Sequence, residues 1–90
     1  MIVDQVSETL QIIRSLARQG RVVFSSHAEE EARRSGIALE DVVFALARAT
    51  KCGWQPKAQT WKVKGKDRFD VTMVIIVDIQ DDLVVVTVFD

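Results

Sequence analysis

The single histidine of this 90-residue chain, His27, is the side chain best suited to proton transfer near neutral pH. It follows a short β-branched run, residues 21–25, and precedes three glutamates that favour a helix start. Backbone N–H groups at such a start can hold a phosphate beside an imidazole. His27 is therefore a candidate general acid or base, and the alternative is a histidine that packs or caps the helix. Ser26 is the predicted N-cap, because Glu29 follows it three residues later.

A row of lysines with nearby tryptophans is the second candidate site. Lys62, Lys64 and Lys66 occupy alternate positions, so on a strand they would project from one face. Trp54 and Trp61 could stack bases beside these cations. This combination favours RNA as a partner. The alternative is that the lysines protect an edge strand from aggregation.

Composition describes one small domain, residues 1–90, with 13 acidic and 12 basic side chains and a formal charge of −1. That balance excludes nucleic-acid binding through bulk positive charge, but it allows a local basic patch. Cys52 is the one cysteine, which excludes an intrachain disulfide and fits a reducing cytoplasm. With one histidine and one cysteine, we expect no metal site and no cofactor. No apolar run reaches the ~20 residues of a membrane span, so we expect a cytoplasmic protein without a membrane partner.

The elements that must position these residues can be read from hydrophobic periodicity. The predicted fold class is α+β, with the N-terminal helices packed on one face of a small, mainly antiparallel sheet of about four strands. A helix within residues 1–20 precedes an α+β core at 21–90. The predicted helices lie at about 3–19, 26–36 and 39–49, a turn or edge strand at 50–56, and strands at 21–25, 59–64, 71–79 and 83–89, with a hairpin loop at 65–67.

The strand at 71–79 is apolar on both faces, which is unusual for a sheet with one solvated face. A second subunit or a partner could cover the second face, and a curled sheet that covers itself is the alternative. We expect a homodimer or a stable hetero-complex. The predicted interface takes some of Val74, Ile76, Val84, Val86 and Val88.

Several short motifs in this order resemble a small bacterial domain family of unknown function. The family signature is His-Ala, then Arg, then Arg-Gly-Ile, then Glu-Asp-Val, and the resemblance covers about residues 22–89. This chain has Glu31 and Ser35 where the family usually has arginine. The matching segments are Ser26-His27-Ala28, Ser35-Gly36-Ile37, Glu40-Asp41-Val42, the stretch 61–67 and Val86-Thr87-Val88-Phe89.

That family is grouped with RelE/ParE-like toxins, on the fold shared by barnase, EndoU-type and RelE-type ribonucleases. The resemblance implies a RelE-like core with a four-stranded antiparallel sheet and metal-independent RNA cleavage, in which a base activates a ribose 2′-OH. By position, His27 would be the base or acid, Thr87 would lie on the last strand, and Arg68 or Lys64 would contact phosphate. It also implies RNA or a ribosome, and an antitoxin-like protein, as partners. The candidate site residues are then His27, Thr87 and Arg68 for catalysis, and Lys62, Lys64, Lys66, Arg33, Arg34 and Trp61 for RNA binding.

Two classes of function remain open from the sequence. One is a RelE-like, mRNA interferase-like ribonuclease or RNA-binding protein of a toxin–antitoxin pair. The other is a non-catalytic protein-interaction module on the same fold, which would use its apolar sheet face.

Overall fold

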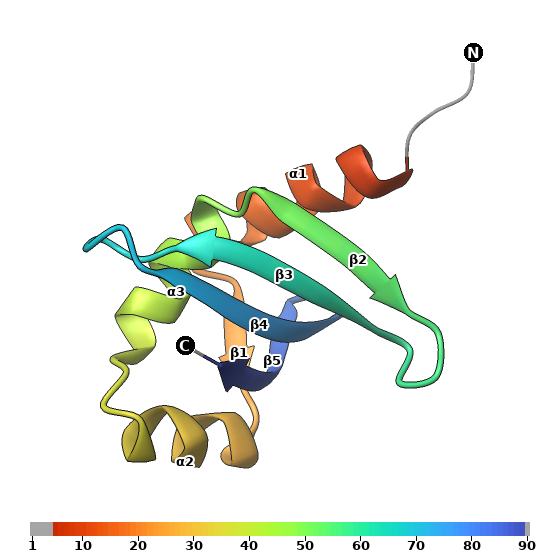
Figure 1. Cartoon of the computed structure of the whole chain (residues 1–90). Helices are drawn as coiled ribbons and strands as arrows, with labels where there is room; N and C mark the ends of the chain where they lie inside the picture. The colour runs from red at the N-terminus through yellow and green to blue at the C-terminus, as the bar shows by residue number, and fades with distance from the viewer. Residues whose placement is uncertain (1–4, 90) are drawn as a thin grey trace.

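The computed structural model describes residues 5–89, which form three helices and a five-stranded sheet (Figure 1). An α+β class was predicted and is confirmed. Among the described residues, no helix is long and apolar enough to cross a membrane. The elements in chain order are α1 (Gln5–Arg18), β1 (Val22–Phe24), α2 (Ser26–Arg34), α3 (Leu39–Ala47), β2 (Lys51–Gln55), β3 (Thr60–Lys66), β4 (Thr72–Ile79) and β5 (Leu83–Phe89).

The sheet has the strand order β1-β5-β4-β3-β2 and is mixed. β1 pairs with β5 in parallel, and the other three pairs are antiparallel. The structure therefore has one strand more than the four expected, because residues 51–55 form a complete edge strand paired with β3. Gly53 is tolerated there because it lies at an edge, and Pro56 falls just after the strand.

A β-bulge in β5 decides which side chains face the core. Ile76 pairs with Thr87 but Val77 pairs with Val85, so the register shifts between these two pairs. The extra residue reverses the alternation of the strand beyond it. Val88 is consequently buried at 3% exposure, and its prediction as an interface residue is wrong.

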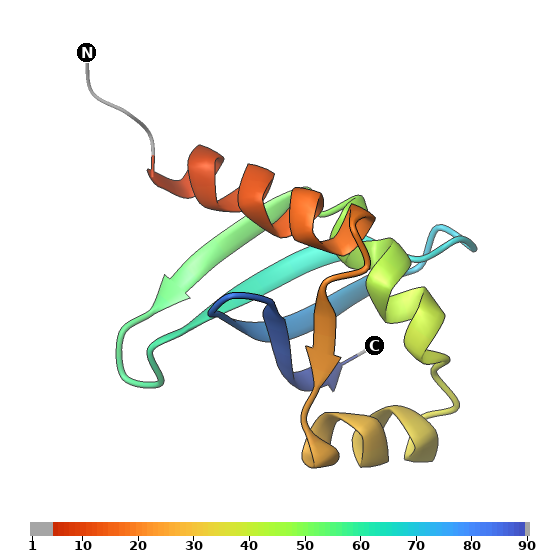
Figure 2. The same ribbon diagram turned by 180° about the vertical axis from the view of Figure 1, so that it is seen from behind.

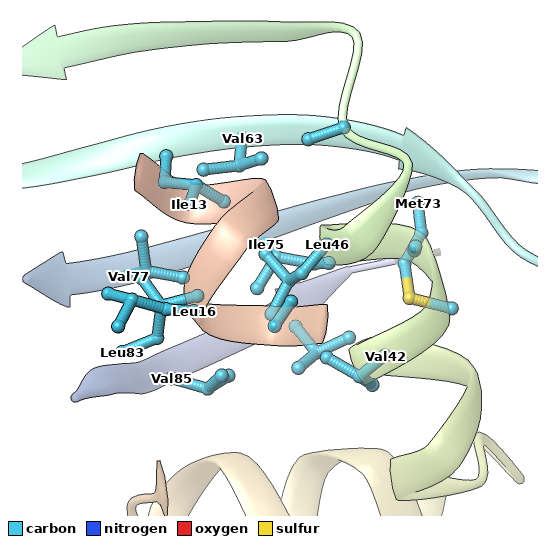
Figure 3. Packing of buried hydrophobic residues seen from close by; sticks show 14 of the residues in the cluster. Ile13, Leu16, Val42, Leu46, Val63, Met73, Ile75, Val77, Leu83 and Val85 are labelled. Atoms are coloured by element: carbon cyan, nitrogen blue, oxygen red, sulfur yellow. The ribbon is translucent and has the colours of Figure 1, made fainter. Parts of the chain in front are cut away.

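The core lies between the sheet and two helices. Figure 2 shows α1 and α3 in front of the sheet, and α2 lies below them. The two helices pack on each other, while α2 packs against β5 and β1. Figure 3 shows the buried side chains that fill the space between these layers. Those with the largest buried volume are Ile13, Leu46, Ile75, Leu83, Val42, Val63, Val77 and Val85.

A helix approaches the sheet closely at Gly65. This residue lies within β3, not in the hairpin loop predicted at 65–67, and it faces the helices. A Cβ atom at Gly65 would overlap the backbone carbonyl of Ala45 in α3. Glycine is therefore required here by the distance between the layers.

Replacing Gly65 with alanine should lower the free energy of unfolding by about 1–3 kcal/mol, because the added methyl group must push α3 from the sheet. Gly53→Ala is the matched control, since a Cβ there would meet no atom within 4 Å. It should change the free energy of unfolding by no more than about 0.5 kcal/mol. Urea denaturation of both variants measures the difference, and equal effects would contradict the proposed close contact.

Candidate nucleic-acid interface

The face of the sheet that points away from α1 and α3 carries the predicted lysine row. Residues directly paired across neighbouring strands share a face, so the pairings identify its members. Lys51 pairs with Lys64, Lys64 with Val74, and Val74 with Phe89. A second row runs from Lys62 through Ile76 to Thr87. We call this surface the open face. The pairs Asp78–Val84 and Val84–Val23 extend it toward β1, so its members are Lys51, Lys62, Lys64, Lys66, Val74, Ile76, Asp78, Val84, Val23, Thr87 and Phe89.

The three predicted lysines are exposed and lie in line along β3. Successive members of the row are about 6.8 Å apart along the strand, and Lys51 adds a fourth cation beside Lys64. Lys66 forms an ion pair with Asp70 at 3.7 Å, whereas the other three lysines take part in none of the ion pairs of residues 5–89. The positive charge of the lysine row is therefore largely unpaired. Lys51 was not predicted to join this row, because the sequence at residues 50–56 was compatible with either a turn or an edge strand.

The tryptophans lie on the other face. Trp61 pairs with the core residue Val77 of β4 on one side and with Trp54 of β2 on the other. The two rings have centroids 5.3 Å apart and are tilted by 58°. The structure thus does not bring Trp61 to the lysines. Phe89, 50% exposed, is the aromatic side chain in the lysine-bearing rows.

His27 lies in the first turn of α2, and Ser25 holds that turn against the sheet. The Ser25 hydroxyl accepts a hydrogen bond from the Ala28 N–H at 3.0 Å and donates one to the Val86 carbonyl at 3.2 Å. The N-cap is therefore Ser25, and the prediction of Ser26 is wrong by one residue. The Ser25 N–H also donates to the Val85 carbonyl, so pairing with β5 fixes where the helix begins.

The His27 imidazole is 64% exposed and its Nε2 lies 2.8 Å from a carboxylate oxygen of Glu31, one helical turn later. An N–H at Nε2 can donate to this oxygen, which leaves Nδ1 available for proton exchange. Glu31 occupies a position where the sequence resemblance led us to expect arginine. A glutamate here provides no positive charge for binding a phosphate. Its carboxylate instead orients the His27 imidazole.

His27 and the lysine row belong to different parts of the sheet. α2 packs against β5 and β1, whereas the lysines lie on β3, two strands beyond β5. Two strand spacings amount to about 10 Å. Thr87 on β5 lies between the two groups and faces the same side as Lys62.

The predicted arginines are elsewhere and mostly paired. Arg68 lies in the β3–β4 loop, where its Nε forms an ion pair with Asp41 of α3 at 2.9 Å. Arg34 pairs with Glu30 at 2.9 Å, and Arg33 is exposed near the end of α2. The structure thus places Thr87 on the same face as the lysines, two strands from Lys62, and leaves His27, Arg33, Arg34 and Arg68 outside the open face.

A comparison with protein-family models found no match for the chain, and a search of curated proteins found none either. Within residues 5–89, no group of three or more His, Cys, Asp and Glu side chains lies close enough together to hold a metal ion. The open face and the His27–Glu31 pair are therefore interpreted from their own geometry.

Ser25→Ala should lower the free energy of unfolding by about 1–2 kcal/mol, because it removes the cap of α2 and leaves the Ala28 N–H without that acceptor. Ser26→Ala is the control. It should change the free energy of unfolding by less than about 0.5 kcal/mol, because Ser26 is exposed and Ser25 provides the cap. Chemical denaturation of the two variants gives the comparison, and a larger loss for Ser26→Ala would contradict the assignment of the cap.

Proposed function

We propose that this protein binds RNA through its open face, as a domain of the RelE-like toxin type. The observation that carries the proposal is the row of Lys62, Lys64 and Lys66, exposed on one face, with Lys51 beside it. Phosphate neutralisation by lysines supplies much of the affinity of proteins for nucleic acids.

The local charge supports this function in spite of the net charge of the whole chain. A phosphate backbone experiences the nearest charges most strongly, since those more than about 8–10 Å away are screened at physiological salt. The nearest charges on this half of the face are the four lysines and Asp70, which pairs with Lys66 and leaves the other three lysines uncompensated. Asp78, the acidic residue of β4, is paired with Val84, toward the other end of the strand.

The uncharged side chains of the open face can contact the base and the sugar of a nucleotide. Phe89 can stack a base, and Val74 and Ile76, both half-buried, give the base and sugar an apolar floor. The Thr87 hydroxyl, two strands from Lys62 on the same face, can donate to a further phosphate oxygen of the same RNA strand. These side chains and the lysines would act on the same strand of RNA.

The RelE-like part of the proposal draws support from the sheet. Four adjacent strands, β5-β4-β3-β2, are antiparallel and packed beneath helices, in line with the fold that the resemblance implies. β1 adds a fifth strand in parallel. An antitoxin-like protein and the ribosome belong to this proposal as partners.

Cleavage of the bound RNA would depend on His27. Its imidazole is exposed and oriented by Glu31, so a bound ribose could exchange a proton with Nδ1. Thr87 could position the phosphate from the neighbouring strand. The lysines, which lie on a different part of the sheet from His27, would hold neighbouring phosphates of the same RNA strand.

A second candidate function, protein interaction, is favoured by the apolar half of the open face. Val74, Ile76 and Val84 are half-buried, and Val23 on β1 is 49% exposed. A protein partner or a second copy would cover these side chains. RNA binding differs from this function in its dependence on the lysines and on salt.

Changing Lys62, Lys64 and Lys66 to glutamine should weaken RNA binding, because each change removes a phosphate contact. The log–log slope of affinity against salt should flatten by about 0.7 per contact, or about 2 in all. Fluorescence anisotropy with a labelled single-stranded RNA at several salt concentrations measures both quantities.

The matched control changes Arg18, Arg48 and Lys57 to glutamine, which removes the same charge from exposed positions outside the open face. It should leave the salt slope almost unchanged. Equal losses for the two sets would show that net charge, and not the open face, determines the binding.

His27→Gln should reduce RNA cleavage by ~10²–10⁴-fold, since glutamine cannot exchange a proton. It should change the free energy of unfolding by less than about 0.5 kcal/mol, because the side chain is largely exposed. Cleavage of a labelled RNA and denaturation of the same samples provide the two readouts. Wild-type protein that does not cleave RNA, or a variant that cleaves it equally well, would exclude this role for His27.

A further inference from the structure

The side of α3 that faces away from the sheet is unusually apolar for an exposed helix surface. Two of the nine residues of α3 are charged and the others are apolar. A helix that is apolar on all sides is normally covered on all sides. The sheet and α1 cover one side of α3, but Phe44 is 38% exposed and Leu39 is 36% exposed. Figure 2 shows α3 in front of the sheet, on the side away from the open face.

Three side chains form a line along this outer side. Glu40, Phe44 and Arg48 are four residues apart and exposed, so they lie one turn after another on one face of the helix. The Arg48 N–H donates to the Phe44 carbonyl at 3.2 Å, which continues the helical spacing to Arg48. The Arg48 guanidinium lies over the Phe44 ring, 5.1 Å from its centroid. We call these three residues the outer stripe.

The outer stripe has opposite charges at its two ends. Glu40 and Arg48 take part in none of the ion pairs of residues 5–89. Arg14 of α1 donates to the Ala49 carbonyl at 2.7 Å, so a second cation lies at the C-terminal end of α3. The outer stripe is therefore acidic at its start, aromatic at its centre and basic at its end.

This order of side chains makes the outer stripe complementary to itself. A two-fold axis brings residue i of one copy against residue j of the other, and j against i. With two α3 helices antiparallel and the axis at Phe44, Glu40 of each copy faces Arg48 of the other. The antiparallel arrangement also sets helix ends of opposite partial charge beside each other.

We propose that a second copy of the chain covers the outer stripe. Phe44 of one copy packs against Phe44 of the other, and an ion pair between Glu40 and Arg48 lies on each side of this contact. A helix of nine residues is about 14 Å long, so the interface is small and the dimer is weak and transient.

This dimer differs from the open-face dimer expected from the sequence. Because α3 lies on the other side of the sheet from the lysines, the open faces of both copies remain accessible to RNA. Dimer formation and RNA binding can therefore be tested separately.

Sedimentation equilibrium of the full chain, without RNA, tests the central contact. Phe44→Ser should raise the dimer dissociation constant at least about tenfold, because the ring is lost from both copies. Phe69→Ser is the control, since it removes an aromatic ring that is 72% exposed but lies in the β3–β4 loop. It should leave the dissociation constant within about twofold of the wild-type value.

Two charge reversals test the register of the helices. Glu40→Arg gives a chain with two cations on the outer stripe, and Arg48→Glu gives a chain with two anions. Each variant alone should dimerise at least about tenfold more weakly than the wild type, because like charges then meet twice. An equimolar mixture should dimerise within about threefold of the wild type, because every contact between the two variants joins opposite charges.

Three results would overturn the proposal. One is a wild-type chain that remains monomeric up to about 1 mM. Another is a dimer that Phe69→Ser weakens as much as Phe44→Ser does. The third is a mixture of the two charge variants that associates no more tightly than either variant alone. Circular dichroism of the same samples checks that each variant is folded.

Discussion

The contact between α3 and β3, where Gly65 lies against the Ala45 carbonyl, is the constraint on which the rest of the structure depends. It brings α3 close to the sheet, and α1 then packs beside α3 over the same side. The buried apolar side chains of β3, β4 and β5 lie on that side of the sheet. The lysines of β3 alternate with Val63 and Gly65, so they must point the other way. The burial of Val63 and Gly65 beneath α3 therefore places the lysines on the opposite face.

The bulge in β5 has an equally specific effect on the open face. With regular alternation, Thr87 and Phe89 would share a face with the buried Val85. The extra residue at the bulge turns both of them to the side of Lys62 and Lys64 and turns Val88 into the core. The face that carries the lysines therefore also carries a hydroxyl group and an aromatic ring. Binding surfaces on sheets frequently depend on such a local irregularity.

Much of this arrangement could be predicted from the sequence, since side-chain alternation is a local property. The lysines at alternate positions and the strand at 71–79 were expected and are found on strands. Long-range distances were not predictable: no sequence pattern reveals that Gly65 must face Ala45, or that residues 51–55 would pair with β3. The N-cap at Ser25 depends on a bond to Val86, 61 residues away. The position of Trp61 opposite the lysines, by contrast, follows from the alternation of β3 itself, because adjacent residues of a strand point to opposite faces.

The central claim is that RNA contacts the open face. Titration of the ¹⁵N-labelled protein with a single-stranded RNA, followed by amide chemical shifts, locates the contact directly. The predicted result is a set of perturbed amides along β3 and in the rows that end at Thr87 and Phe89, with α1 and α3 unaffected. Perturbation confined to the helices, or no change at saturating RNA, would contradict the account.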